Sequence, residues 1–149
     1  MNSIWTIFQN KCLWSAWTAW FLAQLIKVPG RKKMPTLKEF FSSGGMPSSH
    51  SAAVSSLTVA LGLNYGFDSP FFATAAVFAV VVMYDAAGVR RETGRQGKAL
   101  NEIIQQVLIE GQPITDDIMK ELVGHTPLEV TVGCLFGMLI AIVFFYLVH

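Results

Sequence analysis

Four long apolar stretches divide the chain, at residues 12–28, 48–65, 68–89 and 126–148. Each is close in length to the roughly 20 residues that an α-helix needs to cross about 30 Å of hydrocarbon. A basic segment with two prolines separates the first two stretches, and a short Asn-Tyr-Gly-Phe-Asp turn joins the second to the third. The pattern therefore predicts four transmembrane helices, of which the second and third form a hairpin.

A shorter amphipathic pattern follows the third stretch. Between residues 98 and 109, apolar side chains recur at helical spacing opposite Lys98, Glu102 and Gln106. This spacing predicts an amphipathic helix that lies on the membrane or against a neighbouring element. A Gly-Gln-Pro break then precedes a second, short helix, which we expect at residues 115–123.

The composition agrees with a membrane protein, because 52% of the residues are hydrophobic and only 14% are charged. The mean hydropathy is +0.46. At 149 residues the length suits one unit, so we expect a single membrane-embedded, all-α domain over residues 1–149. The bulky first stretch offers no small-residue cleavage site, and we expect the mature protein to keep it. Cys12 and Cys134 fall within or beside apolar stretches, which favours packing roles over a disulfide or a metal site.

The basic residues predict the orientation in the membrane. Ten of the eleven Lys and Arg residues lie within 27–38 or 90–120, and alternating spans put both segments on one side. Only Lys11 lies on the other side. The positive-inside rule then places both segments and the amphipathic helix in the cytoplasm. These residues form no aromatic-interleaved stripe, so no nucleic-acid partner is expected.

The predicted topology gathers polar residues from four distant segments at the cytoplasmic boundary. One histidine of this set could attack phosphorus and the other could protonate the leaving oxygen, while cations and helix N-terminal N–H groups hold the other oxygens. Such a set suits phosphoryl transfer without an obligatory metal or another cofactor. The residues are Lys27, Ser48, Ser49, His50, Asp85, Arg90, Arg91, His125 and Glu129.

Several of these residues also have a purely structural interpretation. Ser48 or its neighbour could be an N-cap, with His50 solvated in the first turn. Thr126 and Glu129 have the spacing of a capping box, although Glu129 also lies one turn from His125 and could accept its imidazole N–H. The two roles of Glu129 are compatible.

The end of the third stretch leaves similar alternatives. Arg90 and Arg91 could simply anchor the end of a span, as basic residues often do. Asp85 points towards function, because a carboxylate inside an apolar helix is costly and tends to have a partner. Lys27 or a ligand could be that partner.

These motifs resemble the type 2 phosphatidic acid phosphatase superfamily, which includes acid phosphatases and vanadium-dependent haloperoxidases. Residues 47–50, Pro-Ser-Ser-His, resemble its Pro-Ser-Gly-His motif, and His125 with Glu129 resembles its His-x-x-x-Asp. Residues 45–51, 84–91 and 124–130 together are similar to a small divergent branch of that superfamily, found in bacterial-type integral membrane proteins.

The resemblance implies roles for individual residues. It implies that His125 is the nucleophile that forms a phosphohistidine and that His50 is the general acid. It also implies that Ser48 and Ser49 donate to the phosphate and that Lys27 is the lysine of the first motif.

Two arginines of the superfamily pattern are missing, because Met34 and Met119 occupy their positions. We infer that Arg90 and Arg91 replace them from the end of the third stretch. The six-helix fold of the superfamily is also reduced to four helices, which a homodimer could complete.

The sequence therefore predicts a metal-independent phosphatase that acts on a membrane lipid phosphate at the cytoplasmic leaflet of a bacterial plasma membrane. Phosphatidylglycerophosphate and phosphatidate are the candidate substrates, since such lipids are made on that side. One alternative is a prenyl pyrophosphate phosphatase, and another is a non-catalytic protein that binds anionic lipid or phosphate. The missing arginines favour the non-catalytic alternative, whereas the pair of histidines argues against it.

Overall fold

The computed structural model describes residues 4–27, 45–88 and 125–148, with positions 92, 94, 96, 97 and 100. These residues form helices and no strand, which confirms the all-α prediction for the described part of the chain. The four apolar stretches coincide with four α-helices to within two residues at each end. The elements are a 3₁₀ helix η1 (Ile4–Gln9), α1 (Lys11–Ile26), α3 (Ser49–Tyr65), α4 (Pro70–Ala87) and α7 (Pro127–Val148).

Short polar side chains fix where these helices begin. Asn10 caps α1 by accepting the Leu13 N–H at 3.0 Å, and Ser69 caps α4 by accepting the Phe72 N–H at 3.2 Å. Gly66 ends α3 with φ of 94°, a conformation that glycine adopts without steric cost. The turn between α3 and α4 is therefore short, as the hairpin prediction requires.

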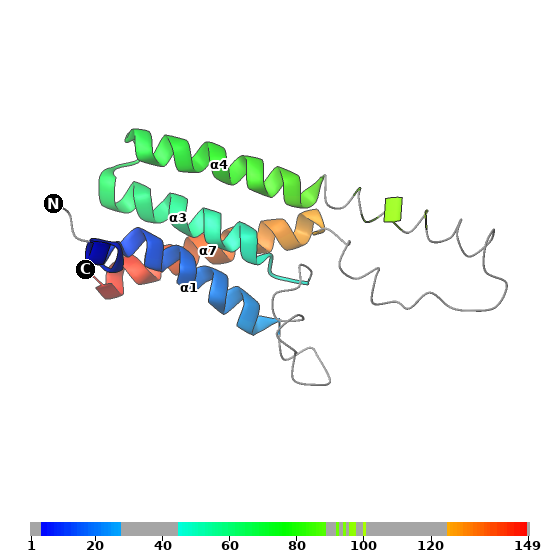
Figure 1. Ribbon diagram of the computed structural model, residues 1–149, viewed down its shortest axis with the longest axis horizontal. Helices are drawn as coiled ribbons and strands as arrows, with labels where there is room; N and C mark the ends of the chain where they lie inside the picture. The colour runs from blue at the N-terminus through cyan, green and yellow to red at the C-terminus, as the bar shows by residue number, and fades with distance from the viewer. Residues whose placement is uncertain are drawn as a thin grey trace.

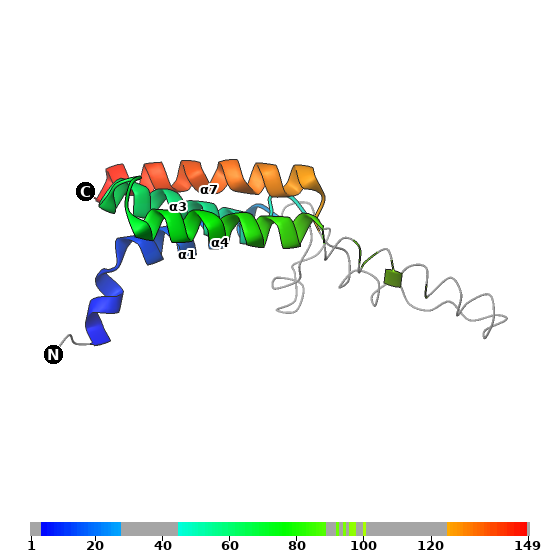
Figure 2. The ribbon, with the colours of Figure 1, turned by 90° about the horizontal axis from the view of Figure 1, so that it is seen from above.

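The four helices run alternately up and down, and α3 contacts each of the other three (Figures 1 and 2). The C-terminal ends of α1 and α4 therefore lie at the same end of the bundle as the N-terminal ends of α3 and α7. We call this end the motif end. The opposite end, where α1 starts and α7 finishes, is the far end.

The interior between α1, α3 and α7 consists of small side chains. A Cβ atom on Gly133 would overlap the Ser48 carbonyl oxygen, and one on Gly137 would overlap the Ala52 carbonyl oxygen. Only a residue without a side chain allows α7 to approach α3 this closely. The alanines at 19, 23, 52, 60 and 141 are also buried in this interior.

Buried hydroxyl groups bridge the helices across this interior. The Oγ atoms of Ser15 and Ser56 are 2.8 Å apart, which joins α1 to α3. Ser55 donates to the Cys134 carbonyl of α7 at 3.0 Å. Hydroxyls that bond across helices are typical of packing between membrane helices, where hydrophobic burial supplies little driving force.

Large apolar side chains lie on the outside of the bundle. Trp17, Phe78 and Leu139, on three different helices, are each 56% exposed. Only 17% of α4 and 22% of an apolar 18-residue stretch of α7 are buried inside the bundle. A soluble protein buries such side chains, so this arrangement indicates that lipid surrounds the helices.

Two of the described helices, α4 and α7, are long and apolar enough to cross a membrane, fewer than the four predicted. The other two are shorter, with 16 residues in α1 and 17 in α3. A 16-residue helix is only about 24 Å long, against roughly 30 Å of hydrocarbon. The predicted helices at 98–109 and 115–123 lie outside the described residues, apart from the single position Leu100.

Candidate functional site

Ser48 ties the start of α3 to the first turn of α7. Its backbone N–H donates to the Glu129 carbonyl at 3.1 Å, and its side chain caps α3. The Ser48 Oγ accepts the Ser51 hydroxyl at 3.1 Å and the Ser51 N–H at 3.5 Å. Ser48 and Ser51 are both fully buried. The N-cap interpretation of Ser48 is therefore correct, and the cap lies against the second motif.

Lys27 lies beside the same helix start. It is the C-cap residue of α1, and its Nζ is 3.5 Å from the Ser49 Oγ. Because an ammonium group can only donate, the Ser49 hydroxyl accepts this contact. The first and second motifs, which are 22 residues apart in sequence, meet at the motif end.

The first turn of α7 contains a complete capping box. Glu129 donates its backbone N–H to Thr126 Oγ1 at 3.3 Å, and Thr126 donates its N–H to Glu129 Oε2 at 2.9 Å. The same Oε2 atom is 3.2 Å from His125 Nδ1. Glu129 thus makes both of the contacts that the sequence allowed.

The contact with Glu129 determines which nitrogen of His125 carries a proton. A carboxylate only accepts hydrogen bonds, so Nδ1 is protonated and the lone pair of the neutral ring is on Nε2. The His125 backbone N–H donates to the Ala86 carbonyl of α4 at 3.2 Å, which holds the residue against a third helix. His125 is 1% exposed and its Nε2 atom is buried.

His50 faces His125 across the motif end. The two ring centroids are 6.4 Å apart and the ring planes are tilted by 55°. His50 is half-buried and its Nδ1 atom has no contact with solvent, so the interpretation of His50 as a solvated residue is wrong for that atom. Two imidazoles from segments 75 residues apart are therefore neighbours at the motif end.

The comparison with known proteins agrees with these motifs. A family model described as the divergent PAP2 family matches residues 8–140. The chain belongs to the divergent PAP2 family. The chain is also similar to the uncharacterized membrane protein YuiD of Bacillus subtilis (strain 168), with 39% identity over 155 aligned positions. That alignment covers 94% of this chain and 97% of the relative. No solved structure matches the chain significantly.

Membership of the divergent PAP2 family confirms the resemblance found in the sequence and relates the chain to phosphatases of membranes. The roles of the individual residues stay predictions. Asp85 lies in the last turn of α4, half-buried and next to Ala86, whose carbonyl holds His125. Arg90 and Arg91 lie outside the described residues, and so do Met34 and Met119. The proposed replacement of the two missing arginines is therefore also still a prediction.

The sequence interpretation missed two features of this divergent PAP2 site. Ser51, one turn after the cap, could have been noticed because an i, i+3 pair of hydroxyls lies on one helix face. The Ala86 carbonyl gave no signal, since a backbone acceptor has no identity in the sequence.

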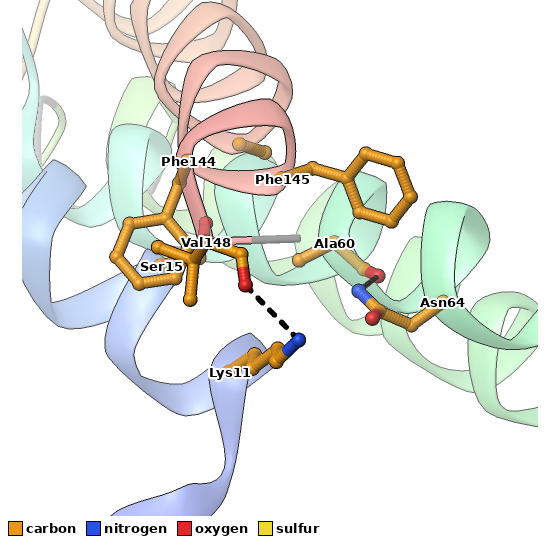
Figure 3. Close-up of a pocket in the computed structure, with 8 residues that line it drawn as sticks. Lys11, Ser15, Ala60, Asn64, Phe144, Phe145 and Val148 are labelled. Carbon is orange, nitrogen blue, oxygen red and sulfur yellow. Dashed lines mark hydrogen bonds between the residues drawn. The ribbon is translucent and has the colours of Figure 1, made fainter.

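A small cavity lies at the far end, between α1, α3 and α7 (Figure 3). Its volume is about 10 Å³, enough for about one water molecule and too little for a phosphate group. Lys11 reaches over it to donate to the Val148 carbonyl at 3.1 Å, and Asn64 donates to the Ala60 carbonyl at 2.7 Å. The first contact joins the start of α1 to the last turn of α7, and the second lies within α3.

Proposed function

We propose that this divergent PAP2 protein is a membrane lipid phosphate phosphatase that works through a phosphohistidine intermediate. The observation that carries the proposal is the pairing of His125 with Glu129 beside His50. Binding an anion requires only cations and a helix N-terminus. An imidazole held by a carboxylate next to a second imidazole is the arrangement of a nucleophile with an acid.

The first step transfers the phosphoryl group to the protein. His125 Nε2 attacks phosphorus and a P–N bond forms, while the bond from phosphorus to the leaving oxygen breaks. Protonated His50 gives its proton to that oxygen, which leaves as the lipid alcohol. Glu129 stabilises the positive charge that develops on the His125 ring.

The second step releases phosphate. His50 is now neutral and accepts a proton from a water molecule as the water oxygen attacks phosphorus. The P–N bond breaks, inorganic phosphate leaves, and both histidines return to their starting protonation states. His50 thereby acts as the acid in the first step and as the base in the second, while His125 is first the nucleophile and then the leaving group.

The start of α3 would stabilise the phosphoryl oxygens during both steps. Its first N–H groups have no intrahelical acceptors, and the helix dipole adds partial positive charge. Ser48 and Ser49 supply hydroxyl donors at this position, and Lys27 supplies a cation beside Ser49. In our proposal Arg90 and Arg91 add further positive charge from the end of α4.

The location of the site favours a lipid substrate at the cytoplasmic leaflet of a bacterial plasma membrane. The motif end adjoins both strongly basic segments, whereas Lys11 is at the far end. Phosphatidylglycerophosphate and phosphatidate carry a phosphate monoester at the depth where apolar helices end. Completion of the bundle by a homodimer belongs to the same proposal.

The direct test is phosphate release by the full-length protein in detergent, with a metal chelator present. Phosphatidylglycerophosphate, phosphatidate and a prenyl pyrophosphate are offered separately. We expect release from one of the two monoesters, and a fall of at least about 100-fold in His125→Ala and His50→Ala. His149→Ala is the matched control, because His149 is the third histidine of the chain and lies outside the motifs.

The other outcomes separate the alternatives. Phosphate release from the prenyl pyrophosphate alone would show that the substrate is a pyrophosphate and not one of the two monoesters. If the folded protein releases no phosphate from any of the three lipids, the result would contradict the enzymatic proposal and favour a non-catalytic protein that binds anions. Full activity in His125→Ala would contradict the phosphohistidine mechanism.

A further inference from the structure

Ser51 is placed to control the hydroxyl of Ser48. The two Oγ atoms are 3.1 Å apart, and Ser51 is the donor of that bond. The backbone N–H of Ser51 also points at the Ser48 Oγ but at 3.5 Å, the outer limit for a hydrogen bond. The hydroxyl contact is therefore the stronger of the two.

These two contacts leave Ser48 with one remaining hydrogen-bonding capacity. A serine hydroxyl has one donor hydrogen and two acceptor lone pairs. Both lone pairs of the Ser48 Oγ accept hydrogen bonds from Ser51. The Ser48 O–H must therefore donate to a group other than Ser51. Because Ser48 and Ser51 are fully buried, water does not compete for these bonds.

The backbone of Ser48 is held as firmly as its side chain. Its N–H donates to the carbonyl of Glu129, the residue that also holds His125. Gly133 packs directly on the backbone of Ser48, where any Cβ atom would overlap it. Ser48 therefore sits in a fixed place relative to the proposed nucleophile, with its hydroxyl prepared to donate.

We propose that Ser51 is a positioning residue that keeps the Ser48 hydroxyl oriented as a donor to a phosphoryl oxygen bound between His50 and His125. This inference rests on the proposed function and deepens it. A hydroxyl fixed as a donor favours an anionic oxygen over a neutral one, and it needs no reorganisation when substrate binds. Without the Ser51 hydroxyl, the Ser48 hydroxyl regains the freedom to rotate and to accept.

The test is a double-mutant cycle measured by binding of orthovanadate, a phosphate analogue, to the purified full-length protein in detergent. We expect Ser51→Ala to weaken binding about five- to tenfold, the size of effect expected for one buried hydrogen bond. Ser48→Ala is expected to weaken binding by at least as much. In a Ser48→Ala background, Ser51→Ala should change the affinity less than twofold, because no hydroxyl is left to orient.

Ser56→Ala is the matched control, because Ser56 is a fully buried serine of the same helix that pairs with Ser15 away from the motif end. We expect it to alter thermal stability without altering vanadate affinity. A purely structural role for Ser51 would give this same result for Ser51→Ala and would overturn the inference. Equal losses from Ser51→Ala with and without Ser48 would also overturn it.

The failure of the inference can be distinguished from the failure of the proposed function. If the wild-type protein binds no vanadate, the phosphate site itself is absent and both proposals fall. If the wild-type protein binds vanadate and His125→Ala abolishes the binding, but Ser51→Ala has no effect, only the role of Ser51 falls.

Discussion

At the scale of single residues, Glu129 connects three parts of the motif end. Its carboxylate accepts from His125 and from the Thr126 N–H, and its carbonyl accepts the Ser48 N–H. Bonds to an ionised acceptor are roughly twice as strong as neutral ones. One residue therefore sets both the ring orientation of the proposed nucleophile and the contact with the α3 cap.

The charge of Glu129 can be separated from its capping role. Glu129→Gln keeps a side chain suited to a capping box but loses the negative charge beside His125. We expect turnover to fall at least about 10- to 100-fold with KM nearly unchanged, since loss of a carboxylate that orients a ligating histidine typically costs this much. Steady-state kinetics on the preferred lipid measures both constants.

Thr126→Ala provides the opposite change. It removes the side chain that accepts the Glu129 N–H but keeps the bond from the Thr126 N–H to Glu129. We expect a loss of about 1 kcal/mol of stability and little loss of turnover.

Unchanged turnover in a folded Glu129→Gln protein would show that the carboxylate does not assist His125.

The sequence predicted some contacts of the candidate site and not others. The spacing of Thr126 and Glu129 predicted the capping box, and the spacing of His125 and Glu129 predicted their contact. The bond from His125 to the Ala86 carbonyl could not be predicted, because it depends on how α4 packs beside α7. Residue types indicate chemistry, whereas backbone contacts appear only in the folded chain.

At the scale of helices, the glycines of α7 set how closely it packs on α3. Gly133 and Gly137 are four residues apart and therefore lie on one face, as in the G-x-x-x-G motif of membrane helices. Gly133 lies against Ser48 and Gly137 lies against Ala52. The hydrogen bond from Ser48 to the Glu129 carbonyl is thus made where the glycine face of α7 packs on α3.

Gly137→Ala should separate α7 from α3. The new Cβ atom would overlap the Ala52 carbonyl and the Ser55 hydroxyl, so the helices must move apart. We expect a loss of about 1 to 3 kcal/mol, measured by thermal or chemical unfolding in detergent. At an exposed helix position, Gly→Ala would stabilise the protein by about 1 kcal/mol. A destabilising effect therefore shows that Gly137 is packed against another helix.

Leu139→Ala is a suitable control for this change, because Leu139 lies two residues away on α7 and is 56% exposed. We expect it to alter stability by less than about 0.5 kcal/mol. A Gly137→Ala protein that is as stable as the wild type, or more stable, would contradict the close packing of α7 on α3.

Hydropathy predicted where the helices are but not which faces meet. The apolar stretches are long and uninterrupted, so their ends could be placed to within two residues. A hydropathy pattern points to Leu, Phe and Trp as the core, yet in this bundle they face outward and Ala, Gly and Ser face inward. The spacing of Gly133 and Gly137 was the sequence signal for this arrangement.

At the scale of the whole molecule, the motif end and the far end differ in chemistry. At the far end, Lys11 donates to the last turn of α7 beside a cavity of about 10 Å³. The motif end brings together a lysine, two serines and two histidines from three helices. Apolar side chains cover the outside between the ends, so a lipid could present its phosphate at the motif end while its tails stay in hydrocarbon.

The central claim is that His125 becomes covalently phosphorylated, and trapping that intermediate tests it most directly. The full-length wild-type and His50→Ala proteins are mixed with the preferred lipid labelled in its phosphate, quenched in base and digested for peptide mapping. We predict an acid-labile phosphoryl group on His125, which accumulates further in His50→Ala if release of phosphate slows more than its transfer. Turnover without any trapped adduct, or an adduct on another residue, would contradict the account.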